Sequence, residues 1–307
     1  MGFYSNGKLL ISGEYLVLKG ALALAVPVKF GQGFIVSQNI NNGLKWKTFV
    51  KGRLWFYAEF SQNNFEIIHS TNDEIAQYIS KLLFEADQIS GGKLPKDRVY
   101  VATEVDFDME WGLGSSSSLI SNVAYWAGVD PFELHFRVSQ GSGYDIACAR
   151  SDNPLFFQNN EGGIKVEKTS FDPLFKNNLY FVYLGQKQDS SKSVKNFILE
   201  KEVGTSIIDE ISEISRKMAS ANNLDDFEIY LRKHEDVLSK VLKQEKIKSS
   251  YFPDFEGEIK SLGAWGGDFA MATFKGPIED LKTYFSGKGL DVVLGFDEMI
   301  LNSISNQ

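Results

Sequence analysis

The chain has 307 residues, of which 43% are hydrophobic and 23% charged, so it is long and apolar enough to bury a core and is not a disordered protein. Its net charge of −8 excludes a general affinity for nucleic acid or an anionic membrane, because neutralising phosphates requires a basic surface. The single cysteine, Cys148, excludes an intrachain disulfide and fits a reducing cytoplasm. We therefore expect a cytoplasmic protein, either a monomer or a homodimer.

Two further features narrow the class of protein. The apolar stretch at residues 22–28 is much shorter than the roughly 20 residues that a membrane helix needs. The three histidines, His69, His135 and His234, lack the spacing of metal ligands, so no transition-metal site is expected.

The first half of the chain is expected to be rich in strands. Residues 7–28 predict a strand, a turn at Gly13 and a resumed strand from Tyr15 to Leu18. Alternating or β-branched apolar residues predict further strands at 34–36, 44–50, 54–60 and 98–105. Helical spacing of apolar residues predicts helices over 73–89 and 115–128, and a short helix over 145–149.

The second half alternates strands with helices, which is typical of an α+β layer. Strands are expected at 179–184 and 290–294, a strand with a turn around 263–273, and helices at 203–221, 224–244 and 277–285. The polar, glycine-rich residues 159–163 predict a domain boundary.

The segment Gly112-Leu-Gly-Ser-Ser-Ser-Ser118 carries the strongest chemical signal. Small residues at a helix start expose backbone N–H groups where the helix dipole is positive, so the segment predicts a phosphate site. The hydroxyls of Ser115 and Ser116 can add donors, and one can ligate Mg²⁺. Taken alone, such a turn is more often a serine-capped helix start. The sequence lacks a GxxxxGK[ST] loop and the third glycine of a dinucleotide fingerprint, which disfavours P-loop proteins and nicotinamide enzymes.

Two other glycine turns carry polar residues. In Gln140-Gly-Ser-Gly-Tyr-Asp-Ile-Ala147, Asp145 can accept a proton from a substrate hydroxyl or orient it, although taken alone it is more often a helix N-cap. The turn Gly263-Ala-Trp-Gly-Gly-Asp-Phe-Ala270 can bring backbone close to a ligand or form a tight hairpin.

Charged residues outside these turns have two interpretations each. Lys8 can neutralise a transferred phosphoryl group or be a solvated lysine. Glu14 can pair with Lys8, orient nearby groups or lie on a surface strand. The polar run from Lys187 to Lys192 can bind a carboxylate or phosphate, or form a flexible loop.

Taken together and in order, these segments resemble the signature motifs of the GHMP kinases. Gly7–Ala21 resembles the opening of mevalonate and phosphomevalonate kinases, the serine-rich turn resembles their ATP-phosphate loop, and Gly263–Asp268 resembles their C-terminal glycine motif. The string Gly143-Tyr-Asp-Ile-Ala147 is similar to the GYDIA-type subgroup. The resemblance implies an α+β fold with a ribosomal protein S5 domain 2-like ATP-binding domain over residues 1–163 and a ferredoxin-like domain over 164–307.

The resemblance also implies roles for individual residues. Asp145 is expected to be the catalytic base, with Lys8 as its electrostatic partner. ATP is expected to bind at Gly112, Leu113, Gly114, Ser115, Ser116 and Ser117, with Ser116 as the Mg²⁺ ligand. The substrate side is expected to include Glu14, Ser142, Gly143, Lys192, Gly263, Gly266 and Gly267. Trp265 replaces a glycine of the family motif, and we expect it to narrow the cleft, stack on a ligand or pack in the core.

The implied function is ATP-dependent phosphorylation of a small anionic metabolite, with a phosphomevalonate-like or mevalonate-like acceptor favoured. Two alternatives stay open. One is a catalytically inactive sensor of nucleotide or metabolite with the same fold, and the other is an enzyme similar to diphosphomevalonate decarboxylase.

Overall fold

The computed structural model describes residues 1–40, 42–185, 197, 203–263, 265 and 267–303. The chain divides into two compact units, each built from separate stretches of sequence. Unit 1 comprises Met1–Gly7, Phe30–Met109 and Leu113–Arg150, and unit 2 comprises Lys8–Lys29, Glu110–Gly112 and Ser151–Gln307.

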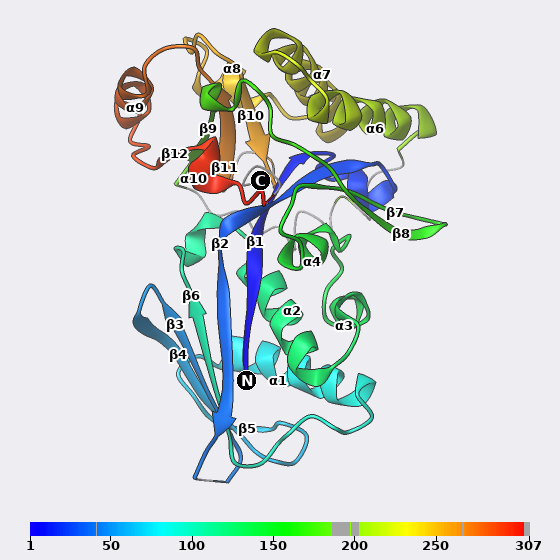
Figure 1. Cartoon of the computed structure of the whole chain (residues 1–307), viewed down its shortest axis with the longest axis vertical. Coiled ribbons are helices and arrows are strands. Elements are labelled where there is room, and N and C mark those ends of the chain that lie inside the picture. Colours follow the sequence, from blue (N-terminus) through cyan, green and yellow to red (C-terminus); the bar gives the residue numbers. More distant parts are fainter. Residues whose placement is uncertain (41, 186–196, 198–202, 264, 266, 304–307) are drawn as a thin grey trace. The chain divides into compact units, whose positions relative to one another are not determined.

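Unit 1 is built on a mixed sheet (Figure 1). The strand order is β5-β4-β3-β6-β2, with β1 paired to β2. The strands are β1 (Gly2–Ser12), β2 (Ala23–Gln38), β3 (Leu44–Val50), β4 (Arg53–Phe60), β5 (Ile67–Ser70) and β6 (Val99–Val105), of which β1 and β2 also contribute residues to unit 2. Strand β3 pairs in parallel with β6, whereas β2–β6, β3–β4 and β4–β5 are antiparallel.

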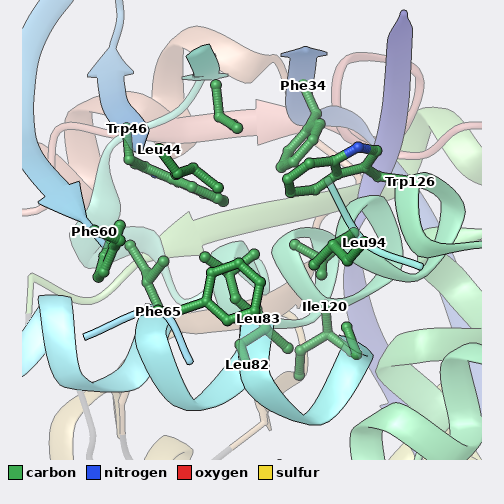
Figure 2. Close-up of a cluster of buried hydrophobic side chains, with 14 of the residues drawn as sticks. Phe34, Leu44, Trp46, Phe60, Phe65, Leu82, Leu83, Leu94, Ile120 and Trp126 are labelled. Carbon is green, nitrogen blue, oxygen red and sulfur yellow. The ribbon is translucent and has the colours of Figure 1, made fainter. Parts of the chain in front are cut away.

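Helices cover one face of this sheet. They are α1 (Asp73–Ile89), α2 (Ser115–Ala127), α3 (Pro131–Val138) and α4 (Tyr144–Ala149). Asn72 is the N-cap of helix α1. Its side chain accepts hydrogen bonds from the N–H groups of Glu74 and Ile75. The apolar stripe of α1 packs in the hydrophobic core of unit 1, where Figure 2 shows Leu82 and Leu83 beside Phe65. This core fixes α1 and α2 on the sheet.

Unit 2 contains a four-stranded antiparallel sheet in the order β10-β11-β9-β12. These strands are β9 (Leu179–Tyr183), β10 (Ile259–Leu262), β11 (Phe269–Thr273) and β12 (Val293–Gly295). The helices of the unit are α6 (Thr205–Ala219), α7 (Leu224–Leu242), α8 (Ile247–Tyr251), α9 (Ile278–Ser286) and α10 (Phe296–Met299). Its core includes Phe252, Phe255 and Phe285, and the ring of Phe285 contacts those of the other two.

A hairpin and three 3-10 helices complete the described elements. Strands β7 (Leu155–Asn160) and β8 (Gly163–Lys168) pair with each other, and β7 also pairs with the first residues of β2. The 3-10 helices are η1 (Leu16–Lys19), η2 (Met109–Trp111) and η3 (Lys176–Asn178). None of the described helices is both long and apolar enough to span a membrane.

The expected α+β fold class is confirmed, and the helices expected at 73–89, 115–128, 145–149, 203–221, 224–244 and 277–285 are found as α1, α2, α4, α6, α7 and α9. The strand predicted from Tyr15 to Leu18 is wrong, because positive φ angles at Gly13 (90°) and Tyr15 (60°) reverse the chain into η1. Helix α3 and strands β5, β7 and β8 were not anticipated. The predicted boundary between residues 163 and 164 lies in the β7–β8 hairpin, but compactness alone does not test the domain division, which stays a prediction.

Candidate active site

The serine-rich turn of unit 1 forms the start of helix α2. Gly114 is the N-cap in a left-handed conformation, with φ of 91° and ψ of 39°. The N–H of Ser118 donates to the carbonyl oxygen of Gly114 at 3.0 Å, so the N–H groups of the three preceding serines precede the helical hydrogen-bond ladder. Such N–H groups at the positive end of a helix dipole suit an anion.

The serine hydroxyls of this turn point to different surroundings. Ser117 is buried and donates to the carbonyl oxygen of Gly114 at 2.8 Å, and Ser118 is buried and donates to Gln32 Oε1 at 2.9 Å. Ser115 is half-buried and Ser116 is exposed, while the side chain of Leu113 is buried. Ser116 is therefore the serine of the turn whose hydroxyl is most accessible to a ligand, and Ser117 can contribute through its backbone N–H.

Asp145 lies in the first turn of helix α4. The N-cap of this helix is Gly143, so the interpretation of Asp145 as an N-cap is wrong. Gly143 has a φ of 98°, and a Cβ atom there would lie 3.3 Å from the ring of Phe132, so the turn requires glycine. Asp145 is half-buried and its Oδ1 accepts a hydrogen bond from the Ile146 N–H at 3.1 Å.

Tyr78 of helix α1 contacts the serine-rich turn. Its Oη lies 2.7 Å from Ser116 Oγ, a hydrogen bond in which either hydroxyl can donate. Burial, and in addition the negative charge of Asp145, raise the pKa of Tyr78 to about 12. Ser116 and Asp145 therefore both lie near Tyr78 in unit 1. Sequence reasoning missed Tyr78, because it treated α1 only as an apolar stripe; a polar phenol within that stripe was the available signal.

In unit 2, the first and third sequence motifs meet at Gly112. Lys8 Nζ donates to the carbonyl oxygen of Gly112 at 2.8 Å. Gly112 has a φ of 64°, and a Cβ atom there would lie 2.3 Å from Cγ of Asp268, the residue that ends the third glycine turn. Asp268 is buried and itself has a positive φ of 52°. Only glycine fits at position 112, because any side chain would occupy the space of this carboxylate.

Glu14 is 2% exposed, so the interpretation as a surface strand residue is wrong. Its carboxylate pairs with the fully buried Lys260, and its Oε2 lies 3.1 Å from His234 Nε2. The N–H of Gly13 donates to the same nitrogen of His234 at 2.9 Å. Burial raises the pKa of the Glu14 carboxyl, but the positive charge of Lys260 opposes burial, and the pKa lies below its usual value. No sequence pattern predicted a role for Lys260, because its partner is far away in the chain.

The remaining predicted residues are spread over both units. Ser142 is buried in unit 1, and Gly263 and Gly267 lie in the third glycine turn of unit 2. Trp265 is half-buried, and its indole N–H donates to the carbonyl oxygen of Glu245 at 3.0 Å. Lys192, Gly266 and the rest of the Lys187–Lys192 run lie outside the described residues.

Comparison with known proteins adds evidence at the level of the fold. No protein-family model matches the sequence, and no curated protein is significantly similar to it. Solved structures do match, and they place the chain in the two-domain fold of the GHMP kinases. At such low sequence identity this likeness establishes the fold and leaves the reaction to be argued from the site.

Three of the matching structures illustrate the range of the fold. The Streptococcus pneumoniae phosphomevalonate kinase, in complex with phosphomevalonate and AMPPNP, has a TM-score of 0.70 at 16% identity, covering 95% of this chain and 98% of that one. The Methanococcus jannaschii mevalonate kinase has a TM-score of 0.69 at 14% identity, covering 98% of each chain. The Lactococcus lactis galactokinase, in complex with galactose, has a TM-score of 0.67 at 11% identity, covering 98% of this chain and 93% of that one.

Proposed function

We propose that the protein is a GHMP-type kinase that transfers the γ-phosphoryl group of ATP to a small anionic metabolite. The observation that carries this proposal is the arrangement in unit 1. Tyr78 contacts Ser116 at the start of α2, and the negative charge of Asp145 in α4 contributes to the raised pKa of Tyr78. An anion-binding helix start and a carboxylate in one neighbourhood are the two elements that phosphoryl transfer requires.

We assign different roles in the reaction to different groups of the chain. The backbone N–H groups of Ser115, Ser116 and Ser117 bind the phosphates of ATP, because they carry partial positive charge and precede the helical ladder. Asp145 orients the acceptor hydroxyl and accepts its proton as the oxygen attacks the γ-phosphorus in line. Lys8 is proposed to neutralise phosphoryl charge, on the sequence resemblance alone.

Magnesium fits the donor set of this turn. Mg²⁺ prefers oxygen ligands and keeps several waters, and the exposed hydroxyl of Ser116 is an oxygen donor open to solvent. A bound Mg²⁺ supplies charge neutralisation at the phosphates. We propose Ser116 as its protein ligand.

The favoured acceptor is a phosphomevalonate-like or mevalonate-like metabolite, and we propose the GYDIA-type subgroup for the chain. The support is the Gly7–Ala21 and Gly143–Ala147 strings, together with the shared fold of a phosphomevalonate kinase and mevalonate kinases. If the acceptor is phosphomevalonate, the attacking atom is a phosphate oxygen, and Asp145 then orients it rather than removing a proton.

The test is ADP formation by the purified protein with Mg-ATP and a panel of phosphomevalonate, mevalonate, galactose and sugar phosphates. We expect ADP to form with one acceptor in an equimolar ratio to the phosphorylated product. Nucleotide binding without ADP formation on any acceptor favours the inactive sensor. Carbon dioxide release together with ADP formation favours the decarboxylase-like enzyme. An absence of nucleotide binding contradicts the kinase, the decarboxylase-like enzyme and a nucleotide sensor.

A further inference from the structure

Among the hydrogen bonds of the described residues, one joins helix α1 to the exposed Ser116 of the α2 turn. Tyr78 makes this hydrogen bond. The two hydroxyls are 2.7 Å apart, although the residues are 38 positions apart in the sequence. Tyr78 is half-buried, and the next residue, Ile79, is part of the core of unit 1. The phenol is thus fixed by the packing of α1 rather than by the turn that it contacts.

This contact restricts a side chain that would otherwise rotate. An exposed serine hydroxyl can occupy three staggered χ1 positions, and a hydrogen bond to a fixed group selects one of them. A tyrosine phenol keeps its proton at neutral pH, and the raised pKa of Tyr78, about 12, extends this to mildly alkaline solution, so the phenol places no negative charge beside a phosphate site. A neutral hydroxyl is therefore suited to orient Ser116 without repelling an anion.

We propose that Tyr78 is a positioning residue of the nucleotide site, which holds the Ser116 hydroxyl in the orientation that meets phosphate or its metal ion. This inference rests on the proposed function. Preorganising a ligand group removes an ordering cost from binding, so the contact strengthens nucleotide affinity without itself touching the reacting atoms.

The test is a double-mutant cycle on the full chain with Tyr78→Phe and Ser116→Ala, read out as the Kd of AMPPNP with Mg²⁺ by calorimetry. Phe keeps the ring packing of position 78 and removes only the hydroxyl. We expect Tyr78→Phe to weaken binding by about fivefold, the equivalent of one hydrogen bond. In the Ser116→Ala background the same change should have no effect, because its partner is already gone.

Tyr100→Phe is the matched control. Tyr100 is half-buried on β6 of the same unit, with its ring centroid 6.0 Å from Lys47 Nζ, and its variant should bind AMPPNP like the wild type. Thermal unfolding of each variant separates a loss of positioning from a loss of folding. Wild-type affinity in Tyr78→Phe, or an equal loss in both backgrounds, overturns the positioning role alone. Failure of the wild-type protein to bind AMPPNP overturns the proposed function and this inference with it.

Discussion

Lys260 and Glu14 form an ion pair that is buried inside unit 2, although the two residues are 246 positions apart in the sequence. The exposed fractions of the two side chains are 0% and 2%. Lys260 Nζ also donates to the carbonyl oxygen of Ser261 at 2.8 Å and lies 3.8 Å from Glu235 Oε1. The pair thereby ties the turn after β1 to strand β10 and helix α7.

Replacing Lys260 by Met should destabilise the protein strongly. The change leaves the Glu14 carboxylate buried without its cation, and breaking one side of a buried pair costs about 3–5 kcal/mol. Urea unfolding measures the difference. The control is Lys275→Met, because Lys275 pairs with Asp225 at 2.8 Å at exposed positions, where solvent screens the charges and an ion pair contributes little to stability. Equal losses in the two variants contradict the structural role assigned to the buried pair.

The same carboxylate predicts a dependence of stability on pH. The pKa of Glu14 in the folded protein lies below the usual 4.5, so the unfolded chain binds more protons in acid. The stabilisation is present above pH 4.5 and is lost as the pH falls through the lower folded pKa. We expect the free energy of unfolding to fall less steeply with acid in Glu14→Gln than in the wild type. Parallel slopes for the two proteins show that this carboxyl is not linked to folding.

Gly112→Ala should destabilise the protein by more than the conformational cost alone. A non-glycine residue at positive φ costs about 1–2 kcal/mol, and the new methyl group would also overlap the carboxylate of Asp268. Gly289→Ala is the control, since Gly289 has a φ of 77° and nothing within 4 Å of a Cβ atom. The double variant Gly112→Ala/Asp268→Gly should recover part of the loss. If Gly112→Ala and Gly289→Ala have the same unfolding midpoint, the close approach is not a constraint.

Asp145→Asn should separate chemistry from binding. With a hydroxyl acceptor such as mevalonate, we expect kcat to fall by about 10²–10⁴-fold, the usual effect of losing a general base, while the Kd for AMPPNP changes little. Time courses of ADP formation give kcat, and calorimetry gives the Kd for AMPPNP. Asp209→Asn, at an exposed position of helix α6, is the control and should leave both unchanged. Undiminished turnover by Asp145→Asn would remove this residue from the proposed mechanism.

Several helices of the structure were predicted correctly from short stretches of sequence. The apolar period of residues 73–89 and 224–244 predicted α1 and α7, and the glycine and serine run predicted the start of α2. Each of these signals lies within a few turns of chain, where the side-chain spacing and the helix caps act directly on the backbone. The turn at Tyr15 escaped prediction, because apolar residues at 16 and 17 are buried equally well by a strand or by a 3-10 helix.

The sequence by itself therefore determined the α+β class and the positions of most helices, and its motifs contain the residues to which we assign the proposed chemistry. Only the tertiary structure decided which distant groups meet: Tyr78 with Ser116, Lys260 with Glu14, and Asp268 with Gly112. The physical reason is separation along the chain. Periodicity and capping are interactions between near neighbours, whereas these contacts exist only after whole helices and strands have packed, and no spacing rule in the sequence encodes that packing.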